Sequence, residues 1–93
     1  SAIGGQLSYW RTPSGSEVDF VWHRAATAVG IEVKAAPRWR AENGAVLRAL
    51  IQEGRLKRGF GVYLGREALR DGRIDVLPLG LFLKRLAAGD VLV

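Results

Sequence analysis

Cysteine is absent from the 93 residues, and this absence removes several classes of site. Without a thiol the chain has no disulfide, no thiolate metal site and no cysteine nucleophile, and a reducing cytoplasm is its default location. Histidine is nearly absent too. His23 is the single histidine, and we expect it at the surface rather than in a zinc or catalytic site. No apolar run approaches the roughly 20 residues that a membrane-spanning helix needs, so we expect no membrane partner.

Acidic residues are outnumbered by basic ones. Fourteen Lys and Arg against nine Asp and Glu leave a net charge of +5. Eleven of the basic residues are arginines, whose forked guanidinium suits phosphate better than the point charge of lysine does. This balance favours a polyanion partner, nucleic acid first, and is equally consistent with a solvated arginine-rich surface. The basic residues form four groups: Arg38 with Arg40, Arg55 with Lys57 and Arg58, Arg66 with Arg70 and Arg73, and Lys84 with Arg85.

Length and hydrophobic pattern predict one α/β domain over residues 1–93. A hydrophobic content of 48% with 25% charged residues is typical of a folded soluble domain. Alternating apolar residues predict five strands, and apolar residues at helical spacing predict two helices. The β-β-β-α-β-β-α order implies a mixed sheet with helices packed on it. The expected strands are 7–11, 17–22, 30–35, 59–64 and 73–77, and the expected helices are about 39–53 and 78–86.

Terminal residues help to place both helices. The first begins at Trp39 or at Asn43, because the Asn43-Gly44 pair weakens its first half, and Gly54 stands where a C-terminal cap belongs. Pro78 occupies a first-turn position of the second helix. The expected buried positions are Val46, Leu47, Leu50 and Ile51 in the first helix and Leu79, Phe82, Leu83 and Leu86 in the second.

Two charged residues interrupt the otherwise apolar stretch AVGIEVKAA at 28–36. Glu32 and Lys34 are two residues apart, so they share one face of an extended chain. Asp19, in the middle of the preceding strand, reaches the same place if the two strands are neighbours. Two carboxylates brought together repel unless a cation neutralises them, and Mg²⁺ or Mn²⁺ suits oxygen ligands. Lys34 beside such an ion orients or deprotonates a water and offsets charge on a phosphate, which is an arrangement for cleaving phosphodiesters.

The spacing D-x12-E-x-K across two strands resembles the PD-(D/E)XK nuclease superfamily, whose restriction-endonuclease-like fold carries its acidic residues on adjacent strands. The resemblance implies that Asp19 and Glu32 are metal ligands, that the Val33 carbonyl is a possible third, that Lys34 is the catalytic lysine and that Glu17 is an accessory acid. A longer pattern resembles the C-terminal domain of a large group of prokaryotic AAA-type ATPases, a domain assigned to this nuclease fold. That pattern covers roughly residues 7–86 and comprises YWRTPSGSEVDFVW, GIEVKAAPR, KRGFGVYLG and IDVLPLGLFL.

The chain departs from this family pattern at two places. Val18 stands where the name-giving proline would precede Asp19, but that proline supplies no ligand. The family core opens with a helix before the first strand, and the nucleotide-binding module lies upstream, whereas these residues contain neither that helix nor a G-x-x-x-x-G-K-[ST] loop. We therefore expect a C-terminal fragment of a larger ATPase that cleaves DNA or RNA. Without the helix, the face carrying Val18, Phe20 and Trp22 is partly bare, which predicts a two-fold homodimer.

Several of these residues have a second interpretation. An E-x-K motif alone is usually a solvated pair, and Glu17 is more often a surface carboxylate than a ligand. The domain as a whole could instead be a non-catalytic interaction or regulatory module for nucleic acid or protein, with Asp19, Glu32 and Lys34 as a structural ion network. Such a module would tolerate Lys34→Ala, whereas a nuclease would not.

An aromatic residue and two glycines leave similar alternatives open. Trp39 lies between Arg38 and Arg40, and the three could bind nucleic acid with the indole stacked on a base. A tryptophan in this place also serves to anchor the helix to the sheet, and we favour that role. Gly59 and Gly61 alternate within an expected strand, which favours the close approach of another backbone over a phosphate-binding loop.

Overall fold

The computed structural model describes residues 6–11, 18–24 and 27–91 of the chain. In the first two of these segments it describes the backbone, together with the side chain of Val21. The elements are β1 Gln6–Arg11, β2 Val18–Arg24, β3 Thr27–Lys34, the 3₁₀ turn η1 Ala41–Gly44, α1 Ala45–Gln52, β4 Arg58–Tyr63, β5 Leu69–Asp71, β6 Ile74–Pro78 and α2 Leu79–Ala87.

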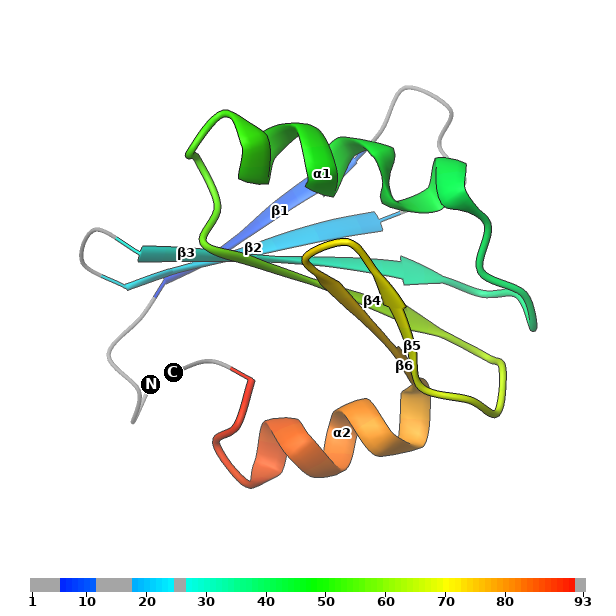
Figure 1. Cartoon of the computed structure of the whole chain (residues 1–93). Coiled ribbons are helices and arrows are strands. Elements are labelled where there is room, and N and C mark those ends of the chain that lie inside the picture. The colour runs from blue at the N-terminus through cyan, green and yellow to red at the C-terminus, as the bar shows by residue number, and fades with distance from the viewer. Residues whose placement is uncertain (1–5, 12–17, 25–26, 92–93) are drawn as a thin grey trace.

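All six strands form one mixed sheet in the order β1-β2-β3-β4-β6-β5. Strands β1, β2 and β3 follow one another as antiparallel neighbours, β3, β4 and β6 are parallel, and β5 pairs antiparallel with β6. Helix α1 makes the crossover from β3 to β4 and covers one face of the sheet, while α2 covers the opposite face (Figure 1). The predicted mixed α/β sheet with helices packed on it is confirmed.

Each face of the sheet has its own hydrophobic core. Under α1, the helix residues Leu47, Leu50 and Ile51 pack on buried side chains of β2, β3 and β6, with Trp39 at the margin. Under α2, Phe82 packs on the other face, where its ring meets Phe60 edge to face at 6.1 Å. Since β3 and β4 lie between both layers, residues in the middle of these two strands are withdrawn from water.

Glycines in β4 let the α1 layer come close to the sheet. A Cβ added at Gly59 would lie 3.3 Å from Ile51, and one added at Gly61 would lie 2.5 Å from the Trp39 ring. The close approach that the alternating glycines predicted is therefore made by side chains, and the expectation of a neighbouring backbone is wrong.

Strands β5 and β3 differ most from those predicted, and β2 ends at Arg24 instead of residue 22. Strand β5, Leu69–Asp71, was not expected, because three residues with two charges carry no alternating pattern; it forms through a tight turn with Gly72 at φ 61°. Strand β3 begins at Thr27 instead of residue 30 and ends at Lys34. Its early start follows from pairing with β2, where Thr27 lies opposite Arg24. The expected turn at 12–16 lies outside the described residues.

The first helix follows the predicted pattern at its end and shifts at its start. Ala45 begins α1 after the turn η1, two residues beyond the later of the two expected starts. Gly54, with φ 76°, follows the helix and donates its N–H to the Ile51 carbonyl at 3.0 Å, as predicted for a C-terminal cap. Val46, expected to be buried, is exposed.

The second helix turns a different face to the sheet from the one expected. Pro78 ends β6 and precedes the first helical residue, so it lies one position earlier than predicted. Phe82 is buried, but Leu79 and Leu83 are 41% and 52% exposed. Phe82 and Leu86 pack on the sheet and lie one turn apart on the helix. The side chains of Leu79 and Leu83 lie beside the line that joins Phe82 to Leu86, on the same side of it. Within the described part of the chain, no helix has the length and apolar character to cross a membrane.

Candidate functional site

Glu32 is the most deeply buried charged residue that the structure describes. It lies in the central strand β3, with 0% of its surface exposed. Alternation along β3 places Glu32 on the α1 face, the face where Gly30 contacts Leu47 and Leu56. Ionised carboxylates are rarely withdrawn from water in this way, because burial is costly unless positive charge or hydrogen bonds compensate for it. This residue is therefore the centre of the candidate site.

The register of the sheet brings the two predicted acidic residues together. Asp19 of β2 is directly opposite Glu32 of β3 in the antiparallel ladder. Residues directly opposite in such a ladder occupy one face, with Cβ atoms roughly 4.5–5.5 Å apart. The Asp19 side chain itself is outside the described part, as is Glu17.

A tryptophan closes the other side of Glu32. In the parallel ladder Glu32 is opposite Gly61 of β4, and the half-buried Trp39 ring lies over that glycine. The indole Nε1–H donates to Asp71 Oδ2 at 3.3 Å, and Arg48 Nη1 donates to the same oxygen at 2.7 Å. Trp39 thus anchors the segment between β3 and α1 to the sheet; base stacking by Trp39 stays a prediction.

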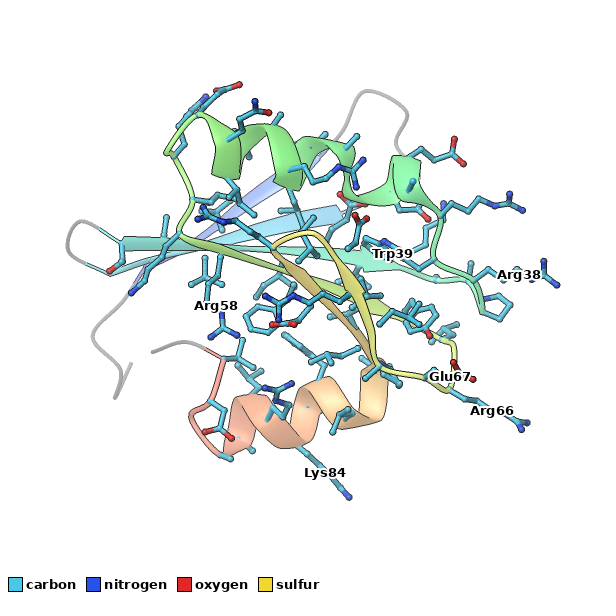
Figure 2. The ribbon with its side chains drawn as sticks, viewed as in Figure 1. Arg38, Trp39, Arg58, Arg66, Glu67 and Lys84 are labelled. Atoms are coloured by element: carbon cyan, nitrogen blue, oxygen red, sulfur yellow. The ribbon has the colours of Figure 1, made fainter. Side chains whose placement is uncertain are left out.

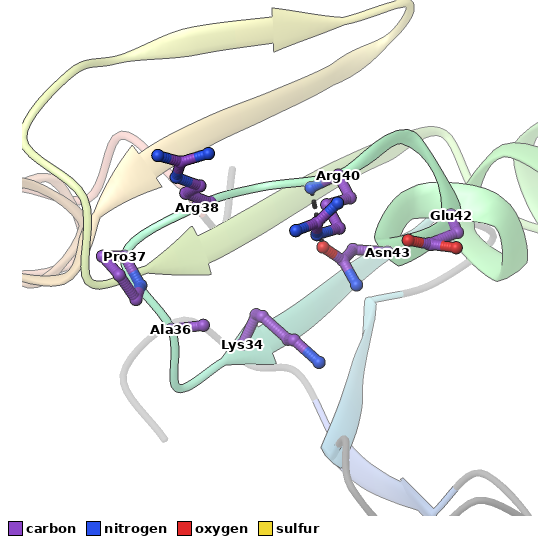
Figure 3. A pocket seen from close by; sticks show the side chains of 7 residues that line it. All are labelled: Lys34, Ala36, Pro37, Arg38, Arg40, Glu42 and Asn43. Carbon is purple, nitrogen blue, oxygen red and sulfur yellow. Dashed lines mark hydrogen bonds between the residues drawn. The ribbon is translucent and has the colours of Figure 1, made fainter.

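Lys34 lies at the carboxyl end of β3, two residues beyond Glu32 and on the same face. Its side chain lines an open pocket of about 500 Å³ at this end of the parallel strands (Figure 3). Ligand sites of parallel sheets lie at this end. The other lining residues are Ala36, Pro37, Arg38, Arg40, Glu42 and Asn43.

Asn43 organises the wall of this pocket. It is only 5% exposed, and its Oδ1 accepts a hydrogen bond from the Arg40 backbone N–H at 2.7 Å. This bond fixes the turn that presents Arg40 next to Lys34, as Figure 3 shows. The sequence predicts Asn43 only as one of two possible helix starts, next to a glycine that weakens the first half of the helix. Asn43 is the third residue of η1, and its bond back to the Arg40 N–H is the capping-box contact of that turn.

The predicted phosphate-binding arginines lie beside the pocket. Arg38 projects from the same edge of the molecule as Arg66 (Figure 2). These two arginines and Trp39 also line a neighbouring depression of about 370 Å³. The depression is braced by Tyr63, whose hydroxyl donates to the Glu67 carbonyl at 2.6 Å. Arg38, Arg40 and Arg66 therefore form an exposed basic rim around the end of β3.

The donor set around Glu32 suits a hard cation. Asp19 and Glu32 offer carboxylate oxygens, which Mg²⁺ and Mn²⁺ prefer. Val33 turns its side chain to the α2 core, so only its backbone carbonyl is available as the third predicted ligand. Among the residues with described side chains, no three His, Asp or Glu converge on one point. Asp19 is one of the predicted metal ligands, but its side chain lies outside the described residues.

Comparisons with known proteins give one match, at the level of a family. No curated protein and no solved structure matches the chain. A family described as "Domain of unknown function (DUF4143)" matches residues 1–82, which include all six strands and the start of α2. This family is typically found with AAA ATPases. The chain therefore belongs to the DUF4143 family.

Proposed function

We propose that this domain cleaves phosphodiester bonds in DNA or RNA with a bound Mg²⁺ or Mn²⁺, using Asp19 and Glu32 as ligands and Lys34 as the catalytic lysine. The observation that carries the proposal is the register of β2 and β3. It sets Asp19 opposite Glu32, with Lys34 following on the same face. Two carboxylates and an amine on one face of two neighbouring strands are the groups that such a metal centre needs.

Energetics support a cation at this place. Two neighbouring carboxylates raise each other's free energy when both are ionised, and burial of Glu32 increases the effect. A divalent cation between them offsets both costs. The Lys34 ammonium contributes further positive charge from the edge of the sheet.

The site residues divide the chemistry among themselves. The metal ion, when bound, supplies positive charge for the phosphate oxygens and for an attacking water. Lys34 follows the buried Glu32 on the same face of β3 and lines the open pocket, so its ammonium can hold a phosphate oxygen or position the water. Arg38 and Arg40 line the same pocket and hold the flanking phosphates.

We further propose that the domain has a restriction-endonuclease-like fold. The D-x12-E-x-K spacing and the mixed sheet agree with a restriction-endonuclease-like fold of the PD-(D/E)XK type. Because DUF4143 is typically found with AAA ATPases, we propose that an ATPase module acts together with this domain. The ATPase would move or remodel the nucleic acid that the domain cleaves.

Calorimetric titration with Mn²⁺ tests the metal centre. The wild-type domain should bind one ion, and both Asp19→Asn and Glu32→Gln should abolish the heat of binding. Glu53→Gln is the matched control, because Glu53 is an exposed carboxylate at the end of α1 and should not alter binding. Lys34→Ala should retain binding, since a protonated ammonium has no lone pair for the metal. A folded wild-type sample without heat at millimolar Mn²⁺ would remove the metal site.

A cleavage assay tests the catalytic role of Lys34. In a protein that also carries the ATPase module, Lys34→Ala should lose metal-dependent cleavage of nucleic acid, whereas the exposed-lysine control Lys84→Ala should retain it. Equal activity of the two variants would contradict the assignment of Lys34.

One observation favours a second candidate, a non-catalytic interaction module. The side chain of Glu32 has no exposed surface, which also suits a structural ion network inside the sheet. Under this alternative, Glu32→Gln destabilises the fold, Mn²⁺ has no effect on the melting temperature, and Lys34→Ala retains function. Thermal melts with and without Mn²⁺ separate the two, because an ion that binds only the native state stabilises it by an amount that grows with the logarithm of the free ion concentration.

A further inference from the structure

A second basic surface lies at the opposite end of the parallel strands from Lys34. Lys57 and Arg58 stand at the start of β4, and Arg70 and Arg73 come from the β5–β6 hairpin. The fold gathers these four residues around one open hollow of about 590 Å³, although they form two separate groups in the sequence. Strand β4 spans five residue steps, so the two ends of the sheet are separated by about 16 Å.

This hollow continues into a second one. Arg48, Ile51, Gln52 and Arg73 line an adjacent depression of about 340 Å³ on the α1 side. The two hollows share Ile51 and Arg73, so they lie side by side, and we treat them together as one groove. We name it the amino-end groove and define it by its basic residues Arg48, Lys57, Arg58, Arg70 and Arg73.

Asp75 holds two of these guanidinium groups in place. Its Oδ2 accepts from Arg58 Nη2 at 3.1 Å, and its Oδ1 accepts from Arg70 Nη1 at 3.0 Å. Arg58 also lies over the Phe60 ring, with its Cζ 4.7 Å from the ring centroid. Arg70 Nε donates to the Gly72 carbonyl at 3.0 Å. The side chains of Arg58 and Arg70 are therefore already restricted before a ligand binds, so that binding costs less conformational entropy.

The groove keeps an excess of positive charge after this ion pairing. Lys57, Arg58, Arg70 and Arg73 contribute four positive charges and Asp75 one negative charge, which leaves +3 in the larger hollow. A lone phosphate needs fewer donors, whereas a row of cations along a groove matches the repeated charges of a polyanion.

We infer that the amino-end groove binds the sugar-phosphate backbone of double-stranded nucleic acid, at a surface separate from the site around Glu32. Among the described residues that line the groove, none is aromatic. Single-strand sites use aromatic side chains on which bases stack, so this lining favours contacts with the backbone of a duplex. Such contacts orient a nucleic acid without reading its sequence. The inference needs no metal and does not rest on the proposed cleavage.

Fluorescence anisotropy with a labelled duplex DNA of arbitrary sequence, in EDTA, tests this surface. Affinity of the wild type should fall steeply as salt rises, and Arg73→Glu and Lys57→Glu should each reduce the slope of log affinity against log salt by about 1. Lys84→Glu is the matched control, since it makes the same change in net charge on α2, where the side chain points away from the sheet (Figure 2). It should leave the slope nearly unchanged.

Three outcomes would overturn the inference. One is an equal effect of Arg73→Glu and Lys84→Glu on the slope, which would show that binding depends on the net charge of the domain and not on the groove. Another is a loss confined to Arg38→Glu and Arg40→Glu, which would assign binding to the basic rim and leave the proposed cleavage site intact. The third is tighter binding of a single strand than of a duplex of the same length. Circular dichroism of each variant confirms that a loss of affinity is not a loss of fold.

Discussion

Gly61 is the position at which the wall of the candidate site can be tested most sharply. It lies in β4 opposite Glu32, beneath the Trp39 ring. In Gly61→Ala the new Cβ would lie 2.5, 2.7 and 2.9 Å from three carbon atoms of that ring. These separations are well inside van der Waals contact, so the indole has to move. The backbone at this position is ordinary strand, so the cost comes from the contact and not from a disallowed φ.

The expected destabilisation follows from two losses and one gain. Overpacking of a core position costs roughly 1–3 kcal/mol, and weakening of the long Trp39–Asp71 hydrogen bond adds up to about 1 kcal/mol. Replacing glycine lowers the entropy of the unfolded chain and returns roughly 0.4–1 kcal/mol. We therefore expect a net loss of about 2 kcal/mol, which lowers the melting temperature of a domain this size by about 8–16 °C.

Urea and thermal unfolding of the 93-residue chain measure this loss. Gly80→Ala is the control, because an added Cβ there meets nothing within 4 Å and the residue lies in α2. It should stabilise the fold by roughly 0.5–1 kcal/mol. In a Trp39→Leu background, where the ring is gone, Gly61→Ala should cost much less than in the wild type. An equal cost in both backgrounds, or a wild-type melting temperature for Gly61→Ala, would refute the packing of Trp39 over Gly61.

Two further predictions concern the sheet and the self-association of the chain. Asp75→Asn should destabilise the fold by roughly 1–2 kcal/mol in urea unfolding, because a carboxylate that is 18% exposed loses its charge toward two guanidinium groups; a loss no larger than that of the exposed Asp90→Asn would contradict this. The chain should also self-associate through the face of Val18, Phe20 and Trp22, whose side chains lie outside the described residues. Analytical ultracentrifugation showing a clean monomer at high micromolar concentration would count against the dimer.

The elements that could be predicted from the sequence are those whose signal is local. Strands β2, β3 and β4 follow from alternation of apolar residues, and α1 follows from apolar spacing with Gly54 at its end. The antiparallel pairing of Asp19 with Glu32 also has a local origin, since β2 and β3 are consecutive strands joined by a short connection. For this reason the sequence alone predicts that Asp19 and Glu32 lie opposite each other.

Features that depend on distant contacts could not be predicted in this way. Strand β5 exists because Leu69, Arg70 and Asp71 pair with β6, and its own residues have no strand pattern. Leu79 and Leu83 have the spacing of a buried helix face, yet the contact of Phe82 with Phe60 turns that face away from the sheet. The spacing of apolar residues identifies an amphipathic helix. The surface on which that helix packs then determines which of its sides is buried.

The distribution of positive charge depends on the fold in the same way. In the sequence, Arg58 and Arg70 belong to different groups, and neither is marked as an ion-pair partner. The sheet brings both to Asp75, and it brings Arg48 to Asp71. Three arginines are thereby held by Asp71 and Asp75, and composition alone does not show which guanidinium groups are positioned in this way.

Glu32 is where local and distant contacts meet. Apolar neighbours in β3 make its strand a central one, and the Trp39 ring over Gly61 closes the adjoining position on β4. An apolar residue at position 32 would avoid the cost of withdrawing a carboxylate from water. A sequence that otherwise agrees with its fold tends to break such a rule at functional or strained positions. Under the proposed function, a cation bound by Asp19 and Glu32 would offset this cost, and the stability of the domain would then rise with the concentration of the metal.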